Sequence, residues 1–320
     1  MNRRQKNDTV CTDLSRADFL RLAGMALLGT GLGVTAGGAS ATTQEGRMLT
    51  RQIPSSGEAL PSVGLGTWQQ FDVAANAPEM AALRQVLELL FEGGGSVIDS
   101  SPMYGAAEER VGDLLAGMQA RPKAFLATKV WTTGREAGLR QMERSAQLLR
   151  SPVIDLMQVH NLLDLAAHLP SLREWKAQGR IRYFGVTHYT SGALDELAQV
   201  IERETPDFVQ LAYSPAVRAA EDRVLPLARD KGVAILVNRP FEGGGLFRKV
   251  RGQDIPDWAQ PFAASWGQFF LKYILSEPTV TCVIPGTSNP RHVVDNLGAG
   301  QGRLPDAGER QRMIRYIEAL

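Results

Sequence analysis

Residues 124–131 read AFLATKVW, and residues 154–160 read IDLMQVH. Both segments are short apolar runs without regular polar alternation, which is typical of strands buried on both faces of a sheet. Amphipathic stretches of helical length separate such runs, for example EERVGDLLAGM at 108–118 and GALDELAQVIER at 192–203. This alternation of apolar and amphipathic segments predicts an α/β fold whose parallel strands are joined by helices.

Eight apolar runs of this kind follow one another along the chain. They are LPSVGLGTW (60–68), SVID (96–99), AFLATKVW (124–131), IDLMQVH (154–160), IRYFGVTHY (181–189), FVQLAYS (208–214), VAILVNR (233–239) and TCVIPGT (281–287). Eight strand–helix repeats in about 260 residues predict a (β/α)8 TIM barrel. An open doubly wound sheet is the competing architecture. RQIPSSGEALP at 51–61, with Ser-Gly at its turn, predicts an N-terminal β-hairpin before the first run.

Composition limits the classes of protein to which the chain can belong. Of its 320 residues 44% are hydrophobic, which is enough for one large core, and the formal net charge of +1 predicts no nucleic-acid partner. The two cysteines, Cys11 and Cys282, do not form a pair with metal-binding spacing, and no other metal-ligand cluster is evident, so we expect no metal site. Cys282 lies within the apolar run VTCVIP and is expected to be a packed core thiol.

Residues 1–41 differ from the rest of the chain and are interpreted as an export signal peptide. Basic residues open the segment, the mildly apolar stretch LAGMALLGTGLGVTAGG follows at 22–38, and an A-x-A cleavage pattern ends it at 39–41. SRADFLR at 15–21 resembles the twin-arginine (Tat) signal, whose core is S-R-R-x-F-L-K. Ala17 replaces the second arginine of that core.

Cleavage near Ala41 would divide the chain into the signal, residues 1–41, and a barrel domain, residues 42–320. The mature protein would have no stable membrane span and would lie in the periplasm, with the export machinery as the partner of residues 1–41. A disordered cytoplasmic tail or an uncleaved anchor is the alternative interpretation of this segment.

Three consecutive predicted strands end in an ionisable residue. SVID ends in Asp99, AFLATK ends in Lys129 and LMQVH ends in His160, while Tyr104 follows in the loop after the first of them. Buried charges are costly unless they are paired, so apolar runs rarely end in charges three times in succession. In a barrel of this type the chemistry lies where strands end. These four residues are therefore the predicted catalytic group.

Their chemistry suits the reduction of a carbonyl group. An aldehyde or ketone that accepts hydride needs a proton on the developing alkoxide, and a tyrosine hydroxyl can donate it. An ammonium group such as that of Lys129 favours the phenolate and so lowers the pKa of the tyrosine from about 10. Asp99 would keep Lys129 charged and oriented, and His160 would hydrogen-bond the substrate oxygen.

The same segments resemble those of the aldo-keto reductases. IDSSPMYG, ATKVW and QVH are similar to the segments that carry the Asp, Tyr, Lys and His of that family. GLGTW, GRIRYFGVTHY, VQLAYSP and VIPGTSNPRHVVDN resemble further family segments in the same order, and the resemblance spans about residues 51–320. It implies a (β/α)8 barrel in which Tyr104 donates the proton.

The resemblance also implies that NADPH, or NADH in its place, binds extended across the barrel mouth. Gln210 matches a glutamine that contacts the nicotinamide carboxamide, and Asn238 stands where many members stack a tyrosine on the nicotinamide. The loop RPFEGGGLF at 239–247 would cover the pyrophosphate. The other cofactor-binding residues implied are Thr67, Trp68, Asp99, Thr187, His188, Arg239, Pro240, Gly286, Thr287, Ser288, Arg291, Asp295 and Asn296.

The segment VIPGTSNPRHVVDN bears on cofactor choice. Gly286 stands where some family members place a lysine on the 2′-phosphate, and the contact would pass to a nearby polar side chain, namely Thr287, Ser288, Arg291 or His292. Asp295 and Asn296 match adenine contacts, and Asn289 is expected to cap the following helix. GLGTW contains G-x-G but no third glycine in place, so the Rossmann fingerprint is absent.

The sequence thus predicts an oxidoreductase that acts on a small aldehyde or ketone. Met103 and Trp131, together with Trp68, are expected to line the substrate pocket, while His168 and His292 are expected at the surface. Two other classes of function remain open. One is a regulatory subunit that binds a nicotinamide nucleotide with little turnover, and the other is a barrel isomerase or lyase without redox chemistry.

Overall fold

The computed structural model of the protein describes residues 46–320. The predicted export signal, residues 1–41, lies outside the described residues. The chain enters the described part through a hairpin of β1 (Thr50–Gln52) and β2 (Ala59–Pro61), which pair antiparallel. Ile53 N donates to Glu58 O at 2.8 Å, and Gly57 has a φ of +76°, which glycine adopts without strain. The predicted hairpin is confirmed.

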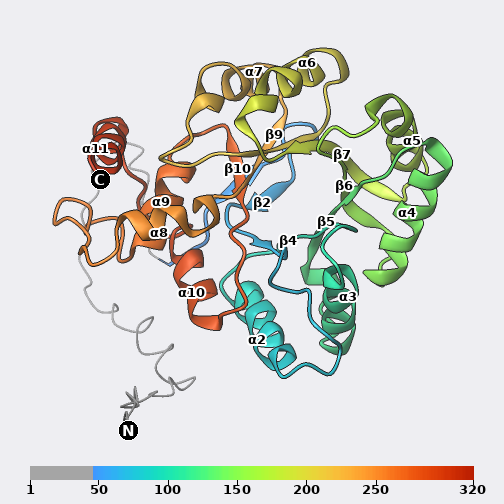
Figure 1. Ribbon diagram of the computed structural model, residues 1–320, viewed down its shortest axis with the longest axis horizontal. Helices are drawn as coiled ribbons and strands as arrows, with labels where there is room; N and C mark the ends of the chain where they lie inside the picture. The colour runs from blue at the N-terminus through green and yellow to red at the C-terminus, as the bar shows by residue number, and fades with distance from the viewer. Residues whose placement is uncertain (1–45) are drawn as a thin grey trace, which may run out of the picture. The chain divides into compact units, whose positions relative to one another are not determined.

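Eight parallel strands follow the hairpin in sequence order around one sheet (Figure 1). They are β3 (Leu65–Gly66), β4 (Val97–Asp99), β5 (Phe125–Val130), β6 (Ile154–His160), β7 (Ile181–His188), β8 (Phe208–Ala212), β9 (Ala234–Asn238) and β10 (Val280–Val283). Parallel bridges between Val63 and Val283 and between Gly66 and Gly286 join the first strand region to the last. This closure confirms the barrel and excludes the open doubly wound sheet.

Helices lie outside the strands; α2 to α9 connect one strand to the next, and α10 and α11 follow the last strand (Figure 1). They are α2 (Glu79–Glu92), α3 (Ala107–Gly117), α4 (Arg135–Leu148), α5 (Leu165–Ala177), α6 (Leu194–Glu204), α7 (Val224–Lys231), α8 (Gly245–Lys249), α9 (Trp266–Leu275), α10 (Pro290–Gly298) and α11 (Ala307–Glu318). Between β9 and β10 the chain forms two helices, α8 and α9, where the other connections place one main helix. Among the described residues, no helix is long and apolar enough to cross a membrane.

The apolar core has two parts. The larger lies between the strands and the helices, as the amphipathic helices require. The smaller joins side chains from the strands, including Phe125, Phe208 and Cys282, to Ile53 and Leu60 of the hairpin. Since both hairpin side chains are almost wholly buried, the hairpin packs into the end of the barrel where β5 and β8 begin. Cys282 is fully buried, as predicted.

The hairpin is also tied to the last third of the chain by Arg51. Its guanidinium donates to Leu275 O at 2.5 Å and to Glu277 O at 3.0 Å, at the end of α9. The carbonyls at a helix C-terminus lack partners within the helix, so these bonds satisfy them. Arg51 therefore joins segments that lie more than 200 positions apart in the sequence.

One surface prediction is wrong. His168 is fully buried on α5, where its Nε2 lies 2.7 Å from Thr132 O, while His292 is exposed as predicted. The helix turns the imidazole inward against Gly138 of α4, whose missing side chain leaves room for the ring. The sequence around His168 does not reveal this pairing between two helices.

Candidate active site

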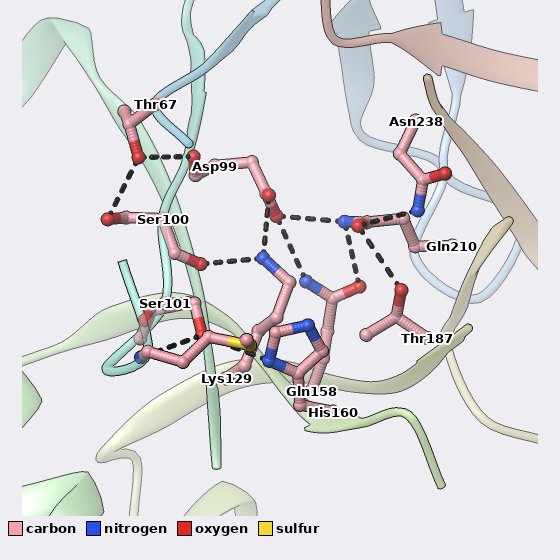
Figure 2. A network of polar contacts seen from close by, with 12 residues as sticks. Thr67, Asp99, Ser100, Ser101, Lys129, Gln158, His160, Thr187, Gln210 and Asn238 are labelled. Carbon is pink, nitrogen blue, oxygen red and sulfur yellow. Dashed lines mark hydrogen bonds and ion pairs between the residues drawn. The ribbon is translucent and has the colours of Figure 1, made fainter. Parts of the chain in front are cut away.

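Asp99, Lys129 and His160, which stand at or near the ends of three successive strands, lie close together at the mouth of the barrel (Figure 2). Asp99 ends β4, and its Oδ2 accepts a hydrogen bond from Lys129 Nζ at 2.6 Å. The same ammonium donates to Ser100 O at 2.6 Å. Both side chains of this ion pair are buried, with Lys129 fully excluded from solvent. Neighbouring parallel strands place their carboxyl ends side by side, which brings these residues together.

Tyr104 and His160 complete the group. The Lys129 Nζ lies 5.0 Å from the centre of the Tyr104 ring, and the rings of Tyr104 and His160 meet edge to face with their centres 5.9 Å apart. The centre of the Trp131 ring lies 6.4 Å from that of the His160 ring. The four residues that the sequence singled out therefore form one cluster at the barrel mouth.

Burial controls the ionisation of the ammonium and the phenol. Burial alone would lower the pKa of Lys129, but the carboxylate of Asp99 and the phenol oxygen of Tyr104 hold that pKa above its ordinary value. Burial raises the pKa of Tyr104, and the ammonium of Lys129 opposes this rise only in part. Lys129 is thus a fixed cation, and Tyr104 keeps its proton at neutral pH.

His160 is neutral in this environment. Burial, together with the nearby charge of Lys129, lowers its pKa to about 3. Its Nδ1 lies 3.0 Å from Ser101 Oγ, which also accepts a long hydrogen bond from Met103 N at 3.4 Å. The Ser101 hydroxyl has one hydrogen and two lone pairs, so it can donate to Nδ1 or accept from it, and the tautomer with its proton on Nε2 is the one in which Ser101 donates.

A chain of amide side chains extends from Asp99 across the barrel (Figure 2). Asp99 Oδ1 accepts from Gln210 Nε2 at 2.8 Å and from Gln158 Nε2 at 3.2 Å. Gln210 Oε1 in turn accepts from Thr187 Oγ1 and from Asn238 Nδ2, each at 3.2 Å. Buried polar groups that satisfy one another in this way hold a single arrangement.

The cluster opens into a cavity of about 710 Å³, a size typical of ligand sites. Of the residues predicted for the site, those that line it are Thr67, Trp68, Asp99, Met103, Tyr104, Trp131, His160, Thr187, Gln210, Asn238, Arg239, Pro240 and Gly286. From the loop expected to cover the pyrophosphate, Phe241, Gly243, Gly244 and Phe247 also line it. The cavity thus continues from the catalytic cluster along this loop.

Other predicted residues lie outside this cavity. Lys129 is fully buried and bonded to Asp99, and the Nδ1 of His188 accepts a hydrogen bond from Thr190 N at 3.2 Å. Asp295 accepts hydrogen bonds from Ser265 and Gln268. The remaining members of the adenine and phosphate assignment are likewise not among the lining residues: Thr287, Ser288, Arg291, His292 and Asn296. Their contacts with the cofactor stay predictions. Asn289 caps α10 as expected, because its Oδ1 accepts from Arg291 N at 3.0 Å.

Several site residues were not predicted. Gln158 precedes His160 by two positions on β6, so the alternation of a strand places both side chains on the same side and was a usable signal. Gln70, Asn161 and Tyr189 line the cavity from loops, where no sequence periodicity marks them. Ser101 lies in the predicted loop, but its partner His160 is 59 positions away.

The backbone is unusual at three places on the cavity wall. Gln69, Asn161 and Arg239 have φ angles of +59°, +52° and +48°. Side chains other than glycine rarely adopt this region, and such conformations gather at functional sites. Their presence on the wall supports the cavity as the working part of the molecule.

The cavity also has features that fit a nicotinamide dinucleotide. The Oδ1 atoms of Asn161 and Asn238 are buried with no hydrogen-bond partner among the described residues, so the wall offers two acceptors to a ligand. Gly243 and Gly244 line the cavity with φ angles of +60° and +85°, and their backbone has no side chain to keep a ligand away. Free acceptors and close backbone are what an extended polar cofactor requires.

Comparisons with known proteins agree with this geometry. The sequence model described as the aldo/keto reductase family matches residues 62–309. The chain is 29% identical over 270 residues to methylglyoxal reductase YeaE of Escherichia coli, covering 81% of this chain and 93% of that protein. It is 25% identical over 319 residues to the NADH-specific methylglyoxal reductase of the same organism, covering 82% and 96%.

Among solved structures, an aldo-keto reductase from Klebsiella pneumoniae in complex with NADPH is similar. The two chains are 26% identical, the TM-score is 0.73, and the match covers 84% of this chain and 95% of that one.

Proposed function

Because the chain belongs to the aldo/keto reductase family, we propose that it reduces the carbonyl group of a small aldehyde or ketone to an alcohol, with NAD(P)H as the hydride donor. The observation that carries this proposal is the protonated Tyr104 beside the buried Lys129–Asp99 pair, facing a cavity that also contains neutral His160. A proton donor, a fixed cation and a neutral hydrogen-bond donor are the groups that carbonyl reduction needs.

The chain's own residues supply the proton and the orientation. When bound, the cofactor supplies hydride to the carbonyl carbon. His160 Nε2–H donates to the carbonyl oxygen and orients it toward Tyr104. The Tyr104 hydroxyl gives its proton to the oxygen as negative charge develops there, and Lys129 stabilises the phenolate that remains. Asp99 is a positioning residue, since it holds Lys129 in place and charged.

The residues proposed to meet the substrate are apolar. Trp68, Met103 and Trp131 line the cavity and leave more than a third of their surface exposed, although they are large hydrophobic side chains. An exposed apolar patch beside a reactive group suits the carbon skeleton of a carbonyl compound. We therefore assign Met103 and Trp131, with Trp68, to substrate binding.

For the cofactor, we propose NADPH with NADH accepted. Gly286 offers no side chain to a 2′-phosphate, and of the ionisable residues that line the cavity only Arg239 is a permanent cation. The similar proteins differ in their cofactor, because one relative is named as NADH-specific and one similar structure holds NADPH. Both points support a modest preference rather than a strict one.

Replacing the proton donor tests the function directly. In Tyr104→Phe we expect turnover with NADPH, measured over a panel of aldehydes and ketones, to fall by at least about 10²-fold, the contribution typical of a general acid. Binding of NADPH, followed by quenching of tryptophan fluorescence, should change little because the ring remains. Tyr316→Phe, on α11, is the matched control. Tight NADPH binding without turnover in the unaltered protein would favour the regulatory-subunit alternative.

A further inference from the structure

The loop that carries Trp131 is held in place by side chains from the helices around it. β5 ends at Val130, and the four residues 131–134 lead from it to α4. Gln141 of α4 bonds both polar backbone groups of Trp131. Its Oε1 accepts from Trp131 N at 2.5 Å, and its Nε2 donates to Trp131 O at 3.1 Å. Loops are usually more mobile than the elements they connect, so this double bond marks an unusually fixed one.

The two bonds also determine how the backbone of Trp131 is oriented. A backbone N–H can only donate and a carbonyl oxygen can only accept, so the Gln141 amide has one possible orientation against them. Two bonds from one side chain restrain the direction of the backbone as well as its place. The rotamers open to a side chain depend on its backbone angles, so Gln141 restrains the direction in which the indole leaves the loop.

The segment between β6 and α5, together with α5 itself, supplies two further bonds to the same loop. His168 Nε2 donates to Thr132 O across 2.7 Å, and Asp164 Oδ2 accepts from Gly134 N at 2.7 Å. Asp164 lies in the short turn between β6, which ends at His160, and α5. The loop that carries Trp131 is therefore bonded to the segment that directly follows His160.

The indole held in this way lies beside the reacting groups. Trp131 lines the cavity with 41% of its surface exposed, and its ring centre lies 6.4 Å from that of His160. His160 is proposed to bond the carbonyl oxygen, so the indole is within reach of a ring attached to the carbonyl carbon. An aromatic surface that is already fixed binds such a ring better, because no freedom of its own is lost on binding.

We propose that Gln141 is a positioning residue that fixes Trp131 as a rigid wall of the substrate pocket and so favours carbonyl compounds with an aromatic group next to the carbonyl. This proposal rests on the proposed function, since it requires a carbonyl substrate beside His160. Gln141 does not itself line the cavity, so it acts through Trp131. A substrate with only a methyl group at this place gains little from the wall.

The test is a double-mutant cycle in steady-state kinetics. Gln141→Met removes both hydrogen bonds at similar side-chain length, and Trp131→Ala removes the indole. KM and kcat for reduction by NADPH are measured with benzaldehyde and with acetaldehyde, in the unaltered protein, both single variants and the double variant. Gln147→Met is the matched control, because Gln147 is an exposed glutamine of the same helix. Circular dichroism and melting temperature verify folding.

We expect Gln141→Met to raise KM for benzaldehyde roughly fivefold, the effect typical of one lost hydrogen bond, and to leave kcat nearly unchanged. In the Trp131→Ala background the same substitution should have no further effect, because the residue that Gln141 positions is gone. KM for acetaldehyde should change little in Gln141→Met, and Gln147→Met should match the unaltered protein. Gln141→Glu keeps the acceptor for Trp131 N but not the donor to Trp131 O, so its KM for benzaldehyde should be intermediate.

A glutamine that serves only the stability of the fold would raise KM equally with and without the indole, or would lower kcat for both aldehydes. Either result would overturn the positioning role and leave the reductase function intact. An unchanged KM for benzaldehyde in Gln141→Met, or reduction of acetaldehyde without reduction of benzaldehyde, would overturn it as well. No turnover of either aldehyde by the unaltered protein would instead contradict the proposed function, and the role of Gln141 with it.

Discussion

Ser101 Oγ and His160 Nδ1 lie 3.0 Å apart, and a loop hydroxyl that donates across this distance keeps the proton of the neutral imidazole on Nε2. Without this bond either tautomer of the neutral ring is accessible, and one of them turns an acceptor toward the substrate oxygen. In Ser101→Ala we expect kcat/KM for carbonyl reduction to fall roughly fivefold, the effect of losing one hydrogen bond worth about 1 kcal/mol. Ser101→Thr should restore most of the rate, and a rate unaffected by Ser101→Ala would show that the hydroxyl has no such role.

Removing only one partner of the buried Lys129–Asp99 ion pair should destabilise the protein strongly. Lys129→Met leaves the Asp99 carboxylate buried without its cation, so we expect a loss of about 3–5 kcal/mol in the free energy of unfolding. Turnover should also fall, because the phenolate of Tyr104 loses its stabilising charge.

Chemical denaturation of Lys129→Met and of the double variant Asp99→Asn/Lys129→Met checks this. The double variant has no unpaired charge and should regain most of the stability but none of the activity. Equal stability of the two variants would contradict the account.

The pH dependence of reduction follows from the two pKa shifts. Burial holds the pKa of His160 at about 3, so the ring does not gain charge between pH 5 and 8. Tyr104 has its pKa raised, so it keeps the proton it must donate and loses it only in strongly alkaline solution. We expect kcat/KM to be flat from about pH 5 to 9 and to fall above the tyrosine's ordinary value of about 10. An inflection near 6.5 would show instead that His160 titrates.

Burial of His160 also affects stability. Its folded pKa lies below its unfolded value of about 6.5, so the unfolded chain binds the proton more readily. The stability that the neutral ring contributes is complete above that value and is lost as the pH falls toward 3. Replacing His160 by Gln should flatten this acid-side loss in thermal melts.

The preference for NADPH over NADH should be modest. With Gly286 in place of a lysine, we expect the ratio of the NADH and NADPH dissociation constants to be closer to one than in lysine-bearing relatives. Phosphate recognition then depends on Arg291 and His292, which are both exposed at the start of α10. A strong NADPH preference that survives Arg291→Ala and His292→Ala would refute this.

Export remains a prediction from the sequence of residues 1–41. A pathway that carries folded proteins would deliver the barrel with its cofactor already bound. We expect a mature N-terminus at Thr42 and a periplasmic pool that falls in Arg16→Gln. N-terminal sequencing of protein from fractionated cells decides this, and an intact Met1 found only in the cytoplasm would overturn it.

The barrel was predictable because its strands are buried on both faces, which forces dense apolar runs whose ends are marked by charged residues. Asp99, Lys129 and His160 were visible in this way. The chain of amides through Gln158, Gln210 and Asn238 was not, because the choice of partner depends on which side chains meet across the barrel. His168 was predicted wrongly at the surface for the same reason. Its two contacts, Thr132 O in the loop after β5 and Gly138 on α4, come from another part of the chain.

The order in which the chain is synthesised bears on the hairpin that packs into the barrel. Ile53 and Leu60 are synthesised early, yet the apolar cluster they join includes Cys282 of β10, which is synthesised near the end of translation. Arg51 likewise finds its carbonyl partners only after α9 exists. The closing of such distant contacts is slow. A nascent or truncated chain that lacks β10 therefore keeps apolar surface exposed at its N-terminal hairpin, and this marks unfinished molecules for chaperones and proteases.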